Sequence, residues 1–270
     1  MFPPELPAIT NKPLYVYRVF VKLFSFFIFG LGTVILITII FPAMRLIFHP
    51  KERFKKYGRR LISLFLRFFV AIMHFLGAID LEVDNRKNFQ NLSSKIVIAN
   101  HPSLLDVVML ISLIPNADCI VNAALNQHIV RGIIQQLYIP NSLDFDNFLQ
   151  ACNNSLVQGN CLIIFPEGTR TPRSGKVILK KGAARIALYS GCNIVPVLIS
   201  GTDKYGLGKK EPWTGYNPQE RYVYRLNIGK EINPEKYIDL PTPKAVQTLT
   251  REMFAVLFPG KEINEEKEEN

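Results

Sequence analysis

A run of 22 residues without a charged side chain, residues 23–44, constrains this chain more than any other feature of its sequence. The run is rich in Phe, Ile and Leu, and as a helix it is long enough to cross a hydrocarbon layer of about 30 Å. It is too long for the apolar region of a secretory signal peptide, and no small-x-small cleavage site follows it. We therefore expect a membrane-spanning helix near the N-terminus, with a buried hairpin of a soluble protein as the alternative.

A second apolar segment, residues 61–79, differs from the first because polar residues recur in it at helical spacing. These residues are Ser63, Arg67 and His74, which would form one polar stripe on an otherwise apolar helix. An arginine at the bilayer centre costs about 2.5 to 3.5 kcal/mol on insertion scales. We therefore expect this helix to lie at the membrane interface or against the first helix, and we predict that residues 1–80 form an N-terminal membrane-anchoring helical hairpin.

The composition indicates which partners the chain meets. It carries a formal net charge of +10 with 48% hydrophobic residues, a combination that favours a membrane surface with anionic lipids. We expect no nucleic acid partner, because no helix-turn-helix, zinc-finger or RNA-binding signature is present. More cations follow the apolar run than precede it, which favours a catalytic domain that faces the cytoplasm. Those after the run are Arg45, Lys51, Arg53, Lys55, Lys56, Arg59 and Arg60, against Lys12, Arg18 and Lys22 before it.

Beyond residue 80, segments typical of strands alternate with segments typical of helices. This order predicts an α/β fold with a mostly parallel or mixed sheet, helices on its faces and functional groups at the strand ends. We assign residues 81–260 to this catalytic domain and expect the tail, residues 261–270, to be disordered. The expected strands cover residues 81–83, 95–99, 119–122, 161–165, 194–200 and 222–228. The expected helices cover residues 104–113, 126–137, 147–158, 182–190 and 244–258.

The segment between the last two strands, residues 201–221, is irregular and long, and it contains basic and aromatic residues. It is either a loop at the membrane interface or an ordinary solvent loop. Elsewhere, no metalloprotease motif, phosphate loop or nucleophile elbow is present, and we expect no metal and no cofactor. The four cysteines lack paired spacing and are expected to be reduced packing residues, namely Cys119, Cys152, Cys161 and Cys192.

The heptapeptide Asn100-His101-Pro102-Ser103-Leu104-Leu105-Asp106 joins an expected strand to an expected helix. Pro102 suits the first helical position, which would leave His101 in the turn and Asp106 in the first full turn. Asp106 could then reach back to one imidazole nitrogen, so that the other nitrogen is free to take a proton from a hydroxyl. A plain alternative stays open, because Ser103-x-x-Asp106 is also a variant of the helix capping box.

A second hexapeptide, Phe165-Pro166-Glu167-Gly168-Thr169-Arg170, follows another expected strand. The two motifs, in this order and at this separation, resemble the glycerolipid acyltransferase family, whose best-known members acylate lysophosphatidic acid. Lys180-Lys181-Gly182-Ala183 and Val195-Pro196-Val197 are similar to two further blocks of that family. The resemblance covers roughly residues 80–230.

The resemblance implies a role for each matching residue. His101 would be the base that deprotonates the acceptor hydroxyl, and Asp106 would orient it. The predicted substrate-binding residues are Glu167, Gly168, Thr169, Arg170, Lys180 and Lys181. The donor would be an acyl thioester of coenzyme A or of an acyl carrier protein, a co-substrate rather than a cofactor, and the product phosphatidic acid. A surface ion pair in a turn is the alternative for Glu167 and Arg170.

One block departs from the family pattern. Lysophosphatidate acyltransferases usually carry an arginine for the glycerol phosphate between the two main motifs, whereas residues 137–142 here contain none. Arg131 could fold in from the preceding segment, and Arg170 with Lys180 or Lys181 could still bind a phosphate. Phosphatidate synthesis is thus the first expectation, with another lysolipid, a glycolipid or a specialised lipid as a second acceptor class. A non-catalytic lipid-binding relative is an alternative of another kind.

Overall fold

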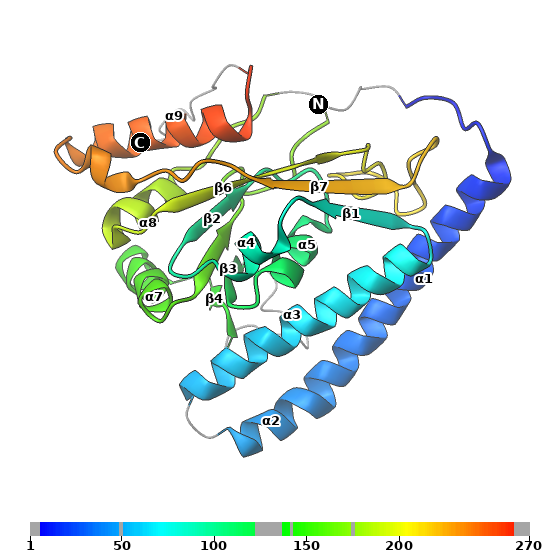
Figure 1. Ribbon diagram of the computed structural model, residues 1–270, viewed down its shortest axis with the longest axis horizontal. Helices are drawn as coiled ribbons and strands as arrows, with labels where there is room; N and C mark the ends of the chain where they lie inside the picture. Colours follow the sequence, from blue (N-terminus) through cyan, green and yellow to red (C-terminus); the bar gives the residue numbers. More distant parts are fainter. Residues whose placement is uncertain (1–5, 49–50, 122–136, 141–142, 174–175, 262–270) are drawn as a thin grey trace.

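The computed structural model describes residues 6–48, 51–121, 137–140, 143–173 and 176–261 (Figure 1). A long helical stretch opens this part of the chain and comprises α1 (Lys12–Ile35), a π-helical turn η1 (Leu36–Ile40) and α2 (Phe41–Ile47). Asn11 caps its start by accepting a hydrogen bond from the Leu14 N–H at 3.0 Å. The whole stretch is long and apolar enough to cross a membrane, and only 11% of its most apolar window is buried. The expected helix over residues 23–44 is therefore present, as the inner part of a longer one.

Helix α3 (Lys51–Phe75) runs back beside α1. The two helices meet through aromatic rings, with the centroid of Phe29 lying 5.6 Å from that of Phe65 and 4.9 Å from that of Phe69. The predicted segment over residues 61–79 was too long at its C-terminal end, because Gly77 takes a left-handed φ of 73° and ends the helical course. Ile79 already belongs to the first strand.

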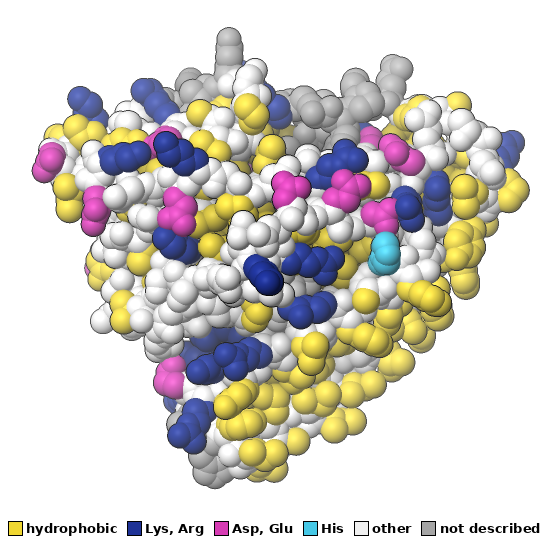
Figure 2. Space-filling model, viewed as in Figure 1, with side chains coloured by type: hydrophobic (Ala, Val, Ile, Leu, Met, Phe, Trp, Pro, Cys, Tyr) yellow, Lys and Arg dark blue, Asp and Glu magenta, His cyan; other side chains and the backbone are white. Residues whose placement is uncertain are grey.

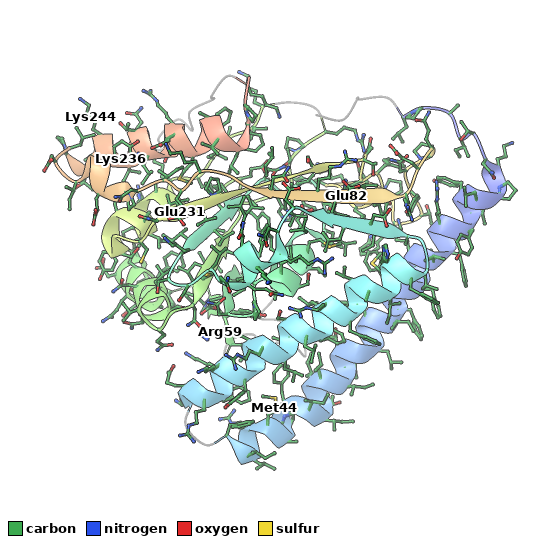
Figure 3. All side chains as sticks on the ribbon, in the orientation of Figure 1. Met44, Arg59, Glu82, Glu231, Lys236 and Lys244 are labelled. Atoms are coloured by element: carbon green, nitrogen blue, oxygen red, sulfur yellow. The ribbon has the colours of Figure 1, made fainter. Side chains whose placement is uncertain are left out.

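The polar residues of α3 are close to the sheet domain, although Arg67 and His74 are themselves exposed. Ser63 is buried, the Arg67 Nε donates to the Ser112 carbonyl at 3.4 Å, and the His74 Nδ1 lies 2.9 Å from Asp80 Oδ1. Arg59 of the same helix reaches toward the sheet, where its guanidinium lies 3.4 Å from the Asp118 carboxylate with both side chains buried (Figure 3). This helix was expected either at the membrane interface or against the first helix. In the structure it packs against α1, and it also contacts the sheet domain.

The described part of the chain forms one sheet of seven strands in the order β1-β7-β6-β2-β5-β3-β4. All pairs are parallel except β6 with β7, so the expectation of a mostly parallel or mixed sheet is confirmed. The strands are β1 (Ile79–Val83), β2 (Ile96–Ala99), β3 (Ala117–Val121), β4 (Ile139–Pro140), β5 (Cys161–Ile164), β6 (Ile194–Gly201) and β7 (Tyr222–Ile228).

Helices cover both faces of the sheet (Figure 1). Along β2 the side chains alternate, so that Val97 and Ala99 join the core under α3 and α5, whereas Ile96 and Ile98 join the core under α7, α8 and α9. The helices of the sheet domain are α4 (Arg86–Gln90), α5 (Asp106–Leu113), α7 (Phe145–Val157), α8 (Gly182–Ser190), the 3-10 turn η3 (Pro234–Tyr237) and α9 (Thr242–Leu257).

Most expected elements are present, with shifted ends. The short elements α4, β4 and η3 were not predicted, and the helix expected over residues 126–137 lies almost wholly outside the described residues, as does the tail beyond residue 261. Residues 201–221 are irregular as expected, yet Tyr216 and Lys204 within them are buried. An ordinary solvent loop was therefore the wrong description, because this loop packs against both the sheet and α1, where Arg18 Nη1 donates to the Gln219 carbonyl at 3.2 Å.

Candidate active site

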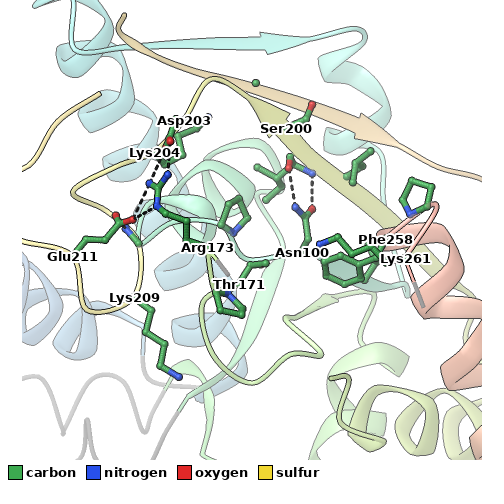
Figure 4. Close-up of a pocket in the computed structure, with 18 residues that line it drawn as sticks. Asn100, Thr171, Arg173, Ser200, Asp203, Lys204, Lys209, Glu211, Phe258 and Lys261 are labelled. Carbon is green, nitrogen blue, oxygen red and sulfur yellow. Dashed lines mark hydrogen bonds and ion pairs between the residues drawn. The ribbon is translucent and has the colours of Figure 1, made fainter. Parts of the chain in front are cut away.

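The first motif begins where β2 ends, at Asn100. The Asn100 side chain donates to the Ile199 carbonyl at 2.8 Å and accepts from the Ile199 N–H at 2.7 Å, so it continues the ladder to β6 after the strand has stopped (Figure 4). This pair of hydrogen bonds fixes the direction in which the chain leaves the sheet. His101 follows at the carboxyl end of β2, the edge at which open α/β sheets bind ligands.

His101 and Asp106 lie together as predicted. The Nδ1 atom of His101 is 2.9 Å from Oδ2 of Asp106, and the two side chains are 18% and 0% exposed. The imidazole also stacks on the Phe165 ring, with centroids 4.1 Å apart and planes 22° apart. The contact with Asp106 and the stacking on Phe165 therefore fix the orientation of the imidazole ring.

Asp106 also holds the turn that precedes α5. Its Oδ2 accepts from the Ser103 N–H at 2.6 Å, and its Oδ1 accepts from the Ser103 hydroxyl at 2.6 Å. The Asp106 carboxylate thus makes both predicted interactions, the capping contact with Ser103 and the contact with the His101 imidazole. The predicted helix start at Pro102 was wrong, because α5 begins at Asp106 and residues 102–105 form the turn that this carboxylate organises.

Glu167 joins the second motif to the first. Its Oε1 accepts from the His101 backbone N–H at 2.9 Å and from the Thr171 hydroxyl at 2.6 Å. Burial raises the pKa of the Glu167 carboxyl, which is 6% exposed. The structure thus places this residue beneath the His101 backbone rather than on an open surface. The surface ion pair offered as an alternative for Glu167 and Arg170 is absent from the described residues.

The other predicted binding residues lie around the turn after β5. Gly168 has a left-handed φ of 64°, and Lys180 folds over it, since a Cβ at position 168 would lie 2.8 Å from the lysine Cε. Thr169 is exposed. Arg170 donates from Nη1 to the carbonyls of Leu207 and Gly208 at 3.0 and 2.7 Å, so it ties this turn to the long loop before β7.

Lys181 is separated from this group. It lines a different hollow, of about 670 Å³, between α7, α8 and α9, together with Phe145, Arg185 and Tyr237. The side chains of these two consecutive residues therefore lie at different sites. Lys180 lies at the second motif, over Gly168, whereas Lys181 does not.

A family model described as Acyltransferase matches residues 80–200, which contain both motifs. This part of the chain is an acyltransferase domain.

Several curated relatives of the chain share one name. A 1-acyl-sn-glycerol-3-phosphate acyltransferase of Cocos nucifera is 35% identical over 40% of this chain and 37% of its own length. The Saccharomyces cerevisiae enzyme of that name is 33% identical over 52% of this chain and 51% of its own. A probable one from Mycoplasma pneumoniae is 26% identical over 76% and 77%. The chain thus spans about a third to a half of the length of the first two relatives and three quarters of the third.

The fold of the chain is similar to that of a solved structure. The crystal structure of the 1-acyl-sn-glycerophosphate acyltransferase PlsC from Thermotoga maritima superposes with a TM-score of 0.65 and 20% identity. The match covers 92% of this chain and 99% of that chain, so it includes the N-terminal helices as well as the sheet.

A hollow of about 300 Å³ opens beside the two motifs (Figure 4). Its lining includes Asn100, Thr171 and Arg173. The Arg173 guanidinium contacts Asp203 at 2.5 Å and Glu211 at 2.9 Å. Arg173 was not singled out from the sequence. Its two carboxylate partners hold the guanidinium charged and raise its pKa further, so it stabilises the loop around the hollow.

Two more residues of the site escaped prediction from the sequence. Thr171 directly follows the second motif, and its oxygen accepts from the His101 N–H at 3.1 Å. Its place after Arg170 was a signal that could have been used. Tyr224 of β7 contacts Ser103 with its hydroxyl at 2.8 Å, and no local pattern marks it, because the contact depends on the order of the strands.

Proposed function

We propose that this protein transfers an acyl chain from an acyl thioester to the free hydroxyl of lysophosphatidate and so forms phosphatidate. The observation that carries the proposal is the His101–Asp106 pair at the carboxyl end of β2, with Nδ1 held at 2.9 Å from the carboxylate. The names of the curated relatives support the same reaction.

The proton moves through His101. Nε2 takes the proton of the acceptor hydroxyl while the hydroxyl oxygen bonds to the thioester carbonyl carbon, and Asp106 stabilises the imidazolium that results. When the tetrahedral intermediate collapses, the carbon–sulfur bond breaks and the imidazolium returns the proton to the departing thiolate. The products are an ester and a free thiol, and no covalent enzyme intermediate is needed.

Two cations near the motifs are suited to the acceptor phosphate. Arg170 uses Nη1 for two backbone carbonyls and lines a small hollow with Leu104 and Lys210, next to the turn that carries His101. Lys180 lies over Gly168 on the same turn. A guanidinium and an ammonium bind phosphate by charge-assisted hydrogen bonds, so these side chains would orient the glycerol hydroxyl toward His101.

The helical pair would anchor the enzyme to a phospholipid membrane. Its outer surface is apolar, as Figure 2 shows for the region of α1 and α2, and Phe20, Phe27 and Leu31 are more than half exposed. Exposed apolar area of this extent marks a membrane or protein contact. Cations concentrated at the start of α3 favour a catalytic domain on the cytoplasmic side.

A second acceptor class has its own support. The described part of the block that lacks the family arginine, residues 137–140, contains edge strand β4 and buries Leu137 against Gly58 of α3. It therefore offers no charged group to a phosphate. Arg131 lies outside the described residues. A lysolipid, glycolipid or specialised lipid without a phosphate monoester is the second candidate acceptor.

The test is acyl transfer by the full chain in lipid vesicles. Labelled acyl-coenzyme A and acyl carrier protein are offered with lysophosphatidate, with other lysolipids and with no acceptor. We expect labelled phosphatidate and thioester loss that depends on added lysophosphatidate. Thioester binding without transfer to any acceptor would instead identify a non-catalytic lipid-binding relative.

A further inference from the structure

Asp106 presents an electrostatic problem that its contact with His101 does not solve. Its side chain is fully buried, and a buried carboxylate must be compensated by hydrogen bonds or a cation. A general base must be neutral before it takes a proton, so His101 offers no positive charge at that stage. Other groups must therefore stabilise the Asp106 carboxylate before the substrate binds.

Ser103 supplies part of that stabilisation, and its geometry fixes the direction of a chain of hydrogen bonds. Its hydroxyl lies 2.6 Å from Asp106 Oδ1 and 2.8 Å from the hydroxyl of Tyr224. A serine hydroxyl has one proton, and the carboxylate is the stronger acceptor. Ser103 therefore donates to Asp106, and Tyr224 must donate to Ser103.

The surroundings of Tyr224 favour its hydroxyl as a hydrogen-bond donor. It projects from β7 and is fully buried, and burial raises the pKa of its hydroxyl well above the ordinary value, so the phenol keeps its proton. The Lys204 Nζ lies 4.6 Å from the centroid of its ring. A cation over the ring draws electron density from the phenol and strengthens its hydroxyl as a donor.

We propose that Tyr224 is a positioning residue for the reaction, acting through Ser103 on Asp106 and so on the orientation of His101. This inference rests on the proposed function. In the relay, the Tyr224 hydroxyl donates to Ser103, Ser103 donates to Asp106 Oδ1, and Oδ2 of Asp106 accepts from Nδ1–H of His101. Without Tyr224 the Ser103 hydroxyl keeps the Leu105 N–H as a donor at 3.2 Å but loses the Tyr224 hydroxyl, so its bond to Asp106 Oδ1 is held less firmly.

A matched control lies two positions away on the same strand. Tyr222 is also fully buried, and its hydroxyl donates to the Tyr205 carbonyl at 2.5 Å. Tyr222→Phe and Tyr224→Phe thus make the same chemical change in one strand, but only the second removes a contact with Ser103. Comparison of the two separates loss of a buried hydrogen bond from loss of the relay.

The experiment measures kcat, KM and thermal stability in vesicles with lysophosphatidate and acyl-coenzyme A. We expect Tyr224→Phe to lower kcat about tenfold with KM unchanged for both substrates, while Tyr222→Phe keeps kcat near the wild-type value. Ser103→Ala should lower kcat as well, and adding Tyr224→Phe to it should cause no further loss, since both act on the same carboxylate oxygen. Equal kcat in the two tyrosine variants, or fully additive losses in the double variant, would overturn the proposal.

A spectroscopic measurement covers the case in which acyl transfer itself is not observed. The Nδ1–H proton resonance of His101, assigned with His101→Ala, reports its hydrogen bond to Asp106. We expect Tyr224→Phe to shift this resonance and Tyr222→Phe to leave it in place. No shift in either variant contradicts the relay, whereas a shift without any acyl transfer keeps the relay and rejects the proposed function.

Discussion

Nδ1 of His101 lies 2.9 Å from Oδ2 of Asp106, although the two residues belong to different parts of a strand-to-helix turn. The arrangement gives a direct prediction. His101→Ala should lower kcat by about a hundredfold or more, and Asp106→Asn should lower it less. Acyl transfer is the measurement, with vesicle binding as the control for folding. A near wild-type rate in His101→Ala would rule out this residue as the base.

Lys204 gives a prediction about pH. Burial lowers its pKa to about 8, while the charges of Asp106, Asp203 and Glu220 favour the ammonium and Arg225 opposes it. Below about pH 8 a positive charge therefore accompanies the Asp106 carboxylate, and above it that charge is lost. We expect kcat to fall on the alkaline side of about pH 8 in the wild type, and Lys204→Met to show a lower kcat without that limb.

The same lysine should affect stability in the opposite direction. Its pKa in the folded protein is below its ordinary value of 10.5, so unfolding takes up a proton between about pH 8 and 10.5. The contribution of Lys204 to the free energy of unfolding therefore rises as pH increases through that range. The melting temperature of the wild type, relative to that of Lys204→Met, should therefore be lower at pH 7 than at pH 9.5. An identical difference at both values would contradict the buried ammonium.

The pair formed by Arg59 and Asp118 predicts a large stability effect. Both side chains are about 95% buried or more, and removal of one member of a buried pair typically costs roughly 3 to 5 kcal/mol. Burial raises the pKa of Asp118 and Arg59 lowers it, so Arg59→Met should raise it further. The loss of stability should thus be largest at neutral pH and shrink as acid protonates Asp118.

An exposed pair provides the control for Arg59. Arg225 contacts Glu82 at 2.5 Å with both side chains about half exposed. Surface pairs contribute little because water screens them, so Arg225→Met should leave the melting temperature close to the wild-type value. A similar fall in melting temperature in Arg59→Met and Arg225→Met would mean that the buried pair contributes no more to stability than the exposed pair.

The outer face of α1 should bind the bilayer. Phe20, Phe27 and Leu31 are exposed, and full burial of such a side chain contributes about 1.5 to 3 kcal/mol. Replacement of all three by serine should weaken sedimentation with vesicles strongly. As a control, serine at Val157 and Ile238, which are exposed on the sheet domain, should change nothing. Extraction of the wild type by high salt alone would contradict an apolar anchor.

The acceptor block predicts weak selectivity for phosphate. Residues 137–140 carry no cation, and one hydrogen bond to a charged group contributes about 1.5 to 3 kcal/mol. The measurement is kcat/KM for lysophosphatidate against a lysolipid without a terminal phosphate monoester. We expect a preference well below about a thousandfold, which corresponds to roughly 4 kcal/mol. A larger preference would mean that another cation fills the place of the missing arginine.

The amino-acid sequence by itself determined the local elements and the pair that defines the site. Periodicity located the main strands, and the position of His101 after an apolar strand placed it at the edge of the sheet. Its separation from Asp106 predicted their contact beside a second possibility, capping by Ser103 and Asp106, and the structure has both. The sequence also predicted helix over residues 23–44, since length and apolar character are local properties.

Only the tertiary structure decided what surrounds that pair. Tyr224 reaches Ser103 across 121 positions of sequence, and Glu167 lies beneath His101 across 66. Both contacts require β7 and β5 to take their places in the sheet, and strand order is not encoded in the period of any single strand. Lys180 and Lys181 illustrate the same limit, because adjacent residues separate only when packing assigns each side chain a direction. Local patterns specify which residues form an element, whereas burial of the two cores selects which distant side chains meet.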